Sequence, residues 1–297
     1  MFLERRRTSD LWGATTIEAG YGPAKKAVAI SRELTSGKVY LPYVPASNQD
    51  KVLARVGKFK EEGGLPSSLV VHLPARRFEN VQGVKGYLSR LSDEGVRNVL
   101  LIGGDDEVPK GQFSSAGDLL KTGILPDHGI TGVGFAAHPE AHPRGIPKDV
   151  LDRALKEKLA VAEAQGLDPW VITQAASSSR ATLDLISQLR KDGVEVPIQA
   201  GVFGPATFPK MFEVLQACGM WDAVKSQGLL KMAKVGIGMR LGNAHRKVFS
   251  DVARANESDP SFRAGVHFFV LDPDMFSKWM NKSKAQTALT DPVVATA

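Results

Sequence analysis

The stretch LVVHLPARRFENVQGVKGYLSRLSDEGVRNVLLI, residues 69–102, decides the fold because it contains a complete strand–helix–strand unit. Leu69–His72 and Asn98–Ile102 are short, nearly continuous runs of apolar and β-branched residues, which is typical of parallel strands covered on both faces. Between them, apolar residues recur at helical spacing over Val81–Glu94, and Gly95 ends the predicted helix. The stretch therefore predicts two parallel strands connected by a helix.

The same alternation continues along the whole chain. The predicted strands are Thr15–Ala19, Lys38–Tyr43, Leu69–His72, Asn98–Ile102, Thr131–Ala137, Trp170–Gln174, Pro197–Val202 and Val266–Val270. The predicted helices are Gln49–Glu62, which Asn48 could cap, Val81–Glu94, Pro147–Gln165, Ser178–Asp192, Met220–Ala233 and Gly238–Ala255. Eight strands favour an α/β fold, a single-domain (β/α)8 TIM barrel with extra helices before the last strand. Because no GxGxxG follows a strand, an open dinucleotide-binding sheet is the weaker alternative.

The composition indicates one large globular domain. The chain has 297 residues, of which 43% are hydrophobic and 24% charged, and these proportions exclude wholesale disorder. We expect an N-terminal extension at residues 1–14, a catalytic barrel at residues 15–284 and a flexible tail at residues 285–297. The single cysteine, Cys218, excludes an internal disulfide and any CxxC-type metal site.

Charge and apolar patterning limit the partners that we expect. No apolar run approaches the roughly 18 residues of a membrane span, and no apolar stretch follows the first arginines as a secretory signal requires. These features predict a cytoplasmic protein without a membrane partner. The formal net charge is +6, and the densest basic clusters are Arg5–Arg7 and Arg76–Arg77. Since no aromatic residues are interleaved with them, we expect solvated surface charge and no nucleic-acid partner.

Polar side chains gather where the predicted strands end. In a closed parallel barrel these ends meet at one mouth, where the active sites of such barrels lie. A lone glutamate or histidine at a strand end is often a surface or packing residue, but the convergence of several at one mouth favours a functional site. The residues are Glu18, His72, Asp105, Asp106, His138, Glu140, His142 and Gln174.

A metal site is one alternative for the motif HPEAHP that begins at His138. His138, Glu140 and His142 have a spacing that could suit zinc in an extended segment, and His72 or Asp105 could complete the set. The two prolines of the motif make the loop rigid, however, so both histidines need not face one ion, and no HExxH motif is present. We therefore expect no metal.

Proton transfer by two carboxylates fits the pattern better. Glu18 lies among apolar neighbours at the end of the first strand, where burial disfavours the ionised form, so it could donate a proton near neutral pH. Asp105 could stay ionised and stabilise a developing cation. Nucleophilic catalysis lacks support, because no GxSxG motif is present and Cys218 lies in a helical stretch. The glycine pair before Asp105 leaves phosphate binding open as a weaker interpretation.

Five motifs, in chain order, resemble the methylenetetrahydrofolate reductase family. TTIEAGYGP at residues 15–23 keeps the glutamate and the final proline of the family's first motif, and LIGGD at residues 101–105 keeps the final Gly-Asp of L-R-G-D. AAHPEAHP at residues 136–143 keeps P-E-x-H-P, and residues 172–174 are identical to I-T-Q. AGVFGP at residues 200–205 matches P-G-I-x-P in part. Together the motifs cover nearly the whole chain.

The resemblance implies a (β/α)8 oxidoreductase that interconverts 5,10-methylenetetrahydrofolate and 5-methyltetrahydrofolate, usually through bound FAD, with NADH or NADPH as the hydride donor or acceptor. It implies that Glu18 is the general acid and that Asp105 lies between pterin and flavin, where it stabilises positive charge. Gln174 and Phe203 would bind the folate. The residues at positions that contact the flavin in the family are His72, Gly104, Ala116, His138, His142 and Lys158.

Four positions depart from the family pattern. Pro42, Gly103 and Ser115 stand where the family has threonine, arginine and tyrosine, and His138 replaces a tyrosine. These changes remove hydroxyl and guanidinium groups from the expected FAD site. Two alternatives therefore stay open: direct hydride transfer from NAD(P)H to the folate in the same fold, and a folate-binding or methyl-transfer partner protein without redox activity. The sequence leaves the choice of NADH or NADPH, the physiological direction and a homo-oligomeric state open.

Overall fold

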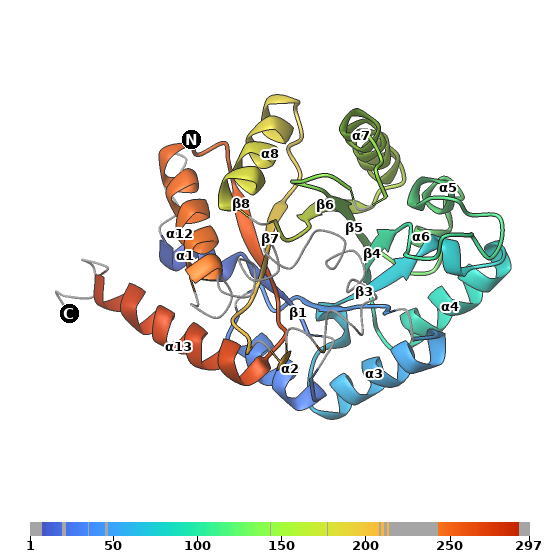
Figure 1. Ribbon diagram of the computed structural model, residues 1–297. Helices are drawn as coiled ribbons and strands as arrows, with labels where there is room; N and C mark the ends of the chain where they lie inside the picture. Colours follow the sequence, from blue (N-terminus) through green and yellow to red (C-terminus); the bar gives the residue numbers. More distant parts are fainter. Residues whose placement is uncertain are drawn as a thin grey trace.

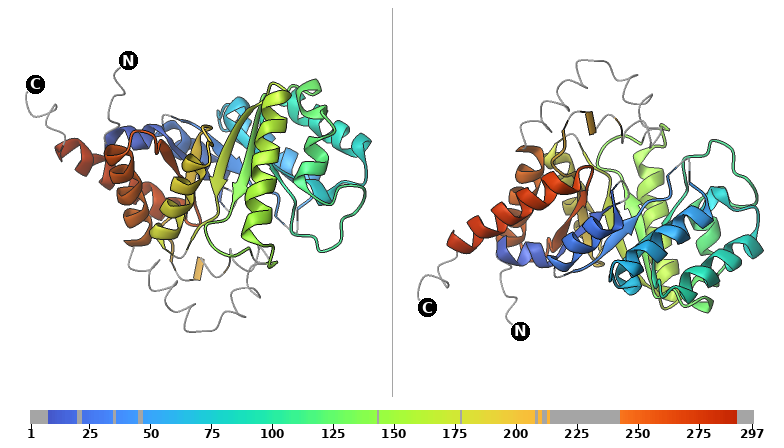
Figure 2. Two further views of the ribbon diagram at one scale, coloured as in Figure 1. Left: turned by 90° about the horizontal axis from the view of Figure 1, so that it is seen from above. Right: turned by 90° about the horizontal axis from the view of Figure 1, so that it is seen from below.

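Eight parallel strands form a closed barrel at the centre of the molecule (Figure 1). A computed structural model describes residues 8–290 except 20–21, 35, 45–46, 143, 177, 208, 211–212 and 214–242. The strands pair in chain order from β1 to β8, and β8 pairs with β1 to close the barrel. Helices surround it on the outside (Figure 2). The predicted (β/α)8 barrel is confirmed.

All eight predicted strands form, with ends that differ by a few residues. They are β1 (Thr15–Glu18), β2 (Val39–Leu41), β3 (Leu69–Pro74), β4 (Asn98–Ile102), β5 (Gly132–Ala137), β6 (Asp168–Thr173), β7 (Ile198–Phe203) and β8 (Ala264–Phe269). The prediction succeeds because helices cover the outside of each strand while packed side chains fill the inside, so both faces select apolar residues.

The helices agree with the sequence where an amphipathic pattern marks them. The predicted helices that form are α3 (Gln49–Glu61), α4 (Val81–Asp93), α7 (Lys148–Ala164), α8 (Ser179–Lys191) and α12 (Asn243–Ser258). As expected, the Asn48 side chain caps α3 by accepting a 2.9 Å hydrogen bond from the Lys51 N–H. Cys218, the predicted helix at residues 220–233 and the first residues of the one at 238–255 lie outside the described residues. The helical elements without a prediction are α1 (Thr8–Gly13), α2 (Ala24–Arg32), α5 (Ala116–Leu120), α6 (Ile124–Asp127), α13 (Pro273–Thr290) and the 3-10 turns η1 (Pro66–Ser68) and η2 (Ala75–Arg77).

The first and last described helices both pack against the barrel. In α1, the buried Trp12 ring lies 4.5 Å from that of Phe249 on α12. The last helix, α13, continues through residues 285–290, where the sequence predicts the start of a flexible tail. Lys284 donates a hydrogen bond to the Glu33 carbonyl at the end of α2, and the alanine and glutamine that follow it favour a helix. No helix among the described residues has the length and apolarity to cross a membrane.

A large indole fills the middle of the barrel. A Cβ at Gly134 would lie 2.6 Å from the Trp170 indole nitrogen, and one at Gly132 would lie 2.9 Å from the same ring. Real Cβ atoms do not approach so closely, so the two glycines of β5 provide the space for Trp170. The buried apolar residues of this inner cluster are Tyr40, Val70, Leu100, Trp170 and Ile172.

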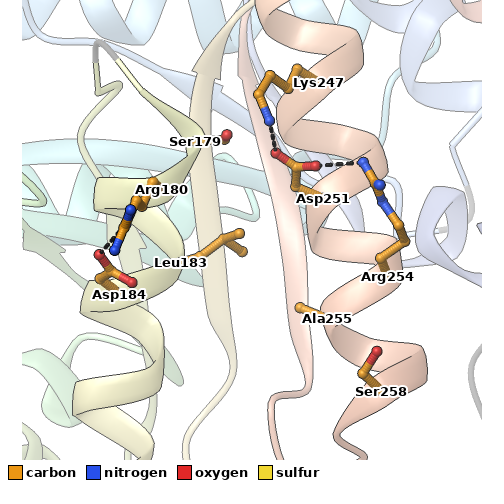
Figure 3. Close-up of a pocket in the computed structure, with 9 residues that line it drawn as sticks. All are labelled: Ser179, Arg180, Leu183, Asp184, Lys247, Asp251, Arg254, Ala255 and Ser258. Atoms are coloured by element: carbon orange, nitrogen blue, oxygen red, sulfur yellow. Dashed lines mark hydrogen bonds and ion pairs between the residues drawn. The ribbon is translucent and has the colours of Figure 1, made fainter.

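Two hollows lie away from the C-terminal mouth. One is a cavity of about 550 Å³ at the N-terminal mouth, where the Lys38 ammonium lies 4.4 Å from the Trp170 ring centroid and burial lowers the pKa of Lys38. The other is a shallow groove of about 400 Å³ between α8 and α12 (Figure 3). In the groove, Asp251 pairs with Lys247 and Arg254, each at 2.7 Å. Neither hollow contains a predicted site residue.

Candidate active site

The closed parallel topology places the predicted site residues around the C-terminal mouth of the barrel. Each strand enters from the opposite end, so strand ends and the loops after them surround one opening. Glu18 ends β1, His72 lies within β3 and Phe203 ends β7. Gly104 and Asp105 follow β4, His138 follows β5 and Gln174 follows β6. Ala116 begins α5, His142 lies before α7 and Lys158 lies on α7.

Glu18 and His72 form a shielded pair inside the mouth. The Glu18 Oε2 atom lies 3.3 Å from His72 Nε2, and the two side chains are only 10% and 12% exposed. The pair has the distance of an ion pair without the alignment of a hydrogen bond, since His72 Nε2 is buried without a hydrogen-bond partner. Glu18 lies next to Tyr40 of β2 and Phe269 of β8 in the sheet register. The carboxyl group is therefore largely screened from bulk water.

Beneath this pair, polar side chains continue into the barrel. The Tyr40 hydroxyl accepts a 2.7 Å hydrogen bond from Trp170 Nε1, and burial raises the pKa of Tyr40. His267 is completely buried, with Nδ1 2.8 Å from the Thr16 hydroxyl, and burial lowers the pKa of His267 so far that its ring is neutral. Tyr40 and His267 are not among the site residues that the sequence predicts. The sequence offers one signal for them, because each is a single polar residue within an otherwise apolar strand.

The loop after β4 presents Asp105 at the mouth. Gly104 has a φ of 98°, in the left-handed region that favours glycine, and a Cβ there would lie 3.1 Å from the Pro74 side chain. Arg144, from the loop after β5, donates a hydrogen bond to the Asp105 carbonyl oxygen. The main chain of Asp105 is thus held from two sides, while the residue itself remains exposed.

Two arginines of η2 hold the same loop. Arg76 donates to the carbonyl oxygens of Asp106 at 3.0 Å and Ser114 at 2.7 Å. Arg77 Nε lies 2.7 Å from the Asp106 carboxylate, its guanidinium lies 5.1 Å from the Tyr43 ring centroid, and its side chain is only 9% exposed. The expectation of solvated surface charge is therefore wrong for this pair. An irregular loop has carbonyl oxygens without strand or helix partners, and the guanidinium groups supply the donors.

His138, His142 and Lys158 form a basic cluster on the β5 side of the mouth. The two histidine rings meet edge to face with centroids 4.6 Å apart. Burial, with smaller effects of His142 and Lys158, lowers the pKa of His138 to about 4, and burial followed by Arg144 lowers the pKa of His142. Burial also lowers the pKa of Lys158 to about 8. At neutral pH the histidines are therefore uncharged and Lys158 carries the positive charge of the cluster.

The HPEAHP loop does not bring metal ligands together in the part of the chain that the structure describes. Within those residues, no three histidine, cysteine, aspartate or glutamate side chains are placed to hold one ion. His142 Nδ1 accepts a 3.1 Å hydrogen bond from the Arg144 N–H, so one ring nitrogen is already used. The ring contact between His138 and His142 is that of packed aromatic rings.

Gln174 and Phe203 follow neighbouring strands of the mouth, β6 and β7. The Gln174 N–H donates to the Ala137 carbonyl at 2.8 Å, and the Gln174 carbonyl accepts from the Thr173 hydroxyl at 3.1 Å. These bonds fix the main chain of an exposed residue. The Phe203 ring packs at a tilt against Phe269, with centroids 5.6 Å apart. An amide beside an aromatic wall suits a flat heterocycle with polar edges.

The groups at the mouth fit the phosphates of a flavin nucleotide better than its ring. Lys158 has no acidic partner among the described residues, so a bound anion would stabilise its charge. Pro42 is buried and offers no side-chain donor, and Gly103 offers no side chain. The Ser115 oxygen caps α5 by accepting from the Asp118 N–H at 3.2 Å, and its side chain is shorter than the tyrosine of the family pattern. FAD therefore fits through its phosphates, with few polar contacts for the isoalloxazine ring.

A (β/α)8 barrel with a shielded carboxyl group at its C-terminal mouth has the architecture of a barrel enzyme. The sequence model of the family methylenetetrahydrofolate reductase matches residues 39–221, which is more than half of the chain. The chain belongs to this family, whose members are oxidoreductases of folate one-carbon chemistry. The matched region contains Asp105, the P-E-x-H-P motif and Gln174, whereas Glu18 lies before it.

Two solved structures illustrate the likeness of the fold. Triosephosphate isomerase from Bartonella henselae is 10% identical over 92% of this chain and 99% of its own, with a TM-score of 0.45. 3-Dehydroquinate dehydratase from Geobacillus kaustophilus HTA426 is 14% identical over 65% of this chain and 74% of its own, with a TM-score of 0.39. At these values the likeness carries no functional argument, and the fold assignment stands on the closed strand order.

Proposed function

We propose that the protein interconverts 5,10-methylenetetrahydrofolate and 5-methyltetrahydrofolate, with NADH or NADPH as hydride donor or acceptor. The observation that carries the proposal is the shielded Glu18 carboxyl, paired with His72, in a chain of the methylenetetrahydrofolate reductase family. Opening the methylene bridge requires a proton on a folate nitrogen, and a carboxyl at this position can deliver it. A protein that only binds folate has no need of an acid there.

The other residues of the mouth have separate roles in this proposal. Asp105 stabilises the positive charge of the iminium that forms when the bridge opens, and Gly104 and Arg144 fix its main chain. Gln174 binds the polar edge of the pterin through its side-chain amide. Phe203 packs against the ring of the substrate.

FAD, when bound, would carry the hydride between the nicotinamide and the folate. Lys158 would hold its pyrophosphate as a point charge, and the neutral rings of His138 and His142 would border the same phosphates. Gly104 and Ala116 would allow close approach at the positions that the family resemblance indicates.

Hydride transfer without flavin is the second candidate mechanism. It is favoured by Pro42 and Gly103, which lack polar side-chain groups, and by Ser115, whose side chain is shorter than the tyrosine of the family pattern. In this case the nicotinamide would lie in the mouth beside Asp105, and Lys158 would bind the phosphates of the dinucleotide. The substrate and the acid, Glu18, are the same in both mechanisms.

One set of measurements separates these possibilities. The purified protein is examined for a flavin absorption spectrum and assayed with 5,10-methylenetetrahydrofolate and NADH or NADPH, with the folate product identified by mass spectrometry. We expect 5-methyltetrahydrofolate. A flavin spectrum supports the first mechanism, and full activity of a colourless protein that added FAD does not stimulate supports the second. Folate binding by calorimetry without turnover under either condition would refute the reductase and indicate a binding protein.

A further inference from the structure

We propose that His72 passes protons to and from Glu18, so that the acid is recharged through the imidazole ring. The proposal rests on the proposed function, because it assigns His72 a part in the same reaction. His72 acts through Glu18, which makes it a positioning and relay residue. Family resemblance places His72 among flavin contacts, whereas the structure places its ring on the carboxyl group.

The geometry isolates the pair from other proton donors. Glu18 is 10% exposed, and His72 is the ionisable side chain within 4 Å of its carboxyl among the described residues. Tyr40, from β2, has its ring 6.4 Å from that of His72, and burial raises the pKa of Tyr40, so its hydroxyl retains its proton. His267, from β8, is neutral because burial lowers its pKa. Of these groups, His72 is therefore the one placed to exchange a proton with Glu18.

The atoms of the pair suit a relay. His72 Nε2 is buried without a hydrogen-bond partner and lies 3.3 Å from Glu18 Oε2, close enough for a hydrogen bond but without its alignment. An imidazole ring can accept a proton at one nitrogen and release one at the other. A residue that only neutralised or packed against the carboxyl would not need this property.

The proton balance of the relay is closed in the reducing direction. Glu18 gives its proton to the folate nitrogen and becomes a carboxylate. The proton on His72 Nε2 then moves to Glu18 Oε2 while His72 Nδ1 takes a proton from solvent, which restores the acid and leaves a neutral ring protonated at Nδ1. Exchange of the ring proton with solvent returns it to Nε2 before the next turnover, so the net change is one solvent proton delivered to the folate. In the oxidising direction the same steps run backwards, and the proton leaves through Nδ1. No oxidant or reductant beyond the hydride carrier of the reaction is involved.

The test compares His72→Gln with the matched control His128→Gln, a histidine at the end of α6 whose Nδ1 lies 3.0 Å from the Ser89 hydroxyl and which has no part in the proposed site. The amide of His72→Gln can donate to the carboxyl but cannot relay a proton. We expect steady-state kcat to fall at least about tenfold, while the rate constant of the first turnover stays within about twofold. Added imidazole should restore kcat of His72→Gln in proportion to its concentration and leave the wild type and His128→Gln unchanged. Flavin absorbance of each variant separates loss of cofactor from loss of proton delivery.

Each outcome decides between the alternatives. Equal losses in first turnover and steady state, without imidazole rescue, would show that His72 only packs against Glu18 and would overturn the relay. An equal stimulation of His128→Gln by imidazole would overturn it too, because the effect would not be specific to the pair. If His72→Gln does not fold, His72→Asn is tested in its place. A wild type without turnover would contradict the proposed function itself. A fully active His72→Gln beside an active wild type would contradict the relay alone.

Discussion

The pKa of about 8 that burial gives Lys158 makes the binding of an anionic cofactor depend on pH. A phosphate group binds the ammonium form of Lys158 and gains little from the neutral amine. We therefore expect the dissociation constant of FAD to increase as the pH rises from 7 to 9. The sign follows from the lowered pKa: the charge is present below pH 8 and is lost above it, whereas an ordinary lysine stays charged throughout this range.

The magnitude follows from the fraction of free protein that carries the charge. With a pKa of about 8, Lys158 is about 90% protonated at pH 7 and about 10% protonated at pH 9, so the apparent dissociation constant rises about tenfold. The neighbouring histidines do not add to this change. The pKa of His138 is about 4 and that of His142 is also lowered, so both rings are neutral from pH 7 to 9.

The assay is a fluorescence titration of flavin-depleted protein with FAD at pH 7, 8 and 9. Lys158→Arg is the matched control, because a guanidinium stays charged at pH 9, and its affinity should be nearly constant. Lys158→Met should bind weakly at all three values. If FAD does not bind, the same titration is made with NADPH. A wild-type dissociation constant that is flat from pH 7 to 9, or a tenfold rise in Lys158→Arg, would refute the assignment of Lys158 to the phosphates.

Three further predictions concern residues of the mouth and the barrel interior. Glu18→Gln should keep the fold and folate binding while kcat falls about 10²–10⁴-fold, and a wild-type kcat in the purified variant would refute its role as acid. Gln174→Ala should weaken binding of 5-methyltetrahydrofolate by about 1–3 kcal/mol with a smaller effect on the chemical step, and calorimetry that finds unchanged affinity would contradict this role. Tyr40→Phe leaves the buried Trp170 N–H unpaired, so urea denaturation should show a loss of about 1–3 kcal/mol, and an unchanged midpoint would argue against the 2.7 Å bond.

The strands and the main helices could be predicted because their signals are local. A strand between helices and a packed interior is apolar on both faces, so runs such as LVVH and NVLLI identify it without knowledge of its neighbours. The start of α3 is also local, since the Asn48 side chain binds an N–H only three residues away. The short helices α5 and α6 carry too few turns for an apolar period and are not predicted.

The interactions of the site could not be predicted, because they join residues that are distant in the chain. Arg76 and Arg77 look like surface charge in the sequence, yet they bind a loop about 30 residues away. His72 and Glu18 meet because β1 and β3 both point side chains into the barrel on either side of β2. Motifs place both residues at the mouth, but only the closed sheet shows that they form a pair.

The changes from the family pattern and the retained lysine have different physical consequences for a flavin. Polar contacts to the isoalloxazine ring are short-ranged and depend little on salt, and the side chains of Pro42 and Gly103 supply none of them. Attraction between Lys158 and a phosphate is electrostatic and is weakened by salt. A flavin held chiefly by Lys158 would therefore dissociate more readily as salt or pH increases, because both reduce the same interaction. Since a nicotinamide dinucleotide also carries a pyrophosphate, Lys158 can serve either ligand, and the loss of ring contacts is what favours direct hydride transfer.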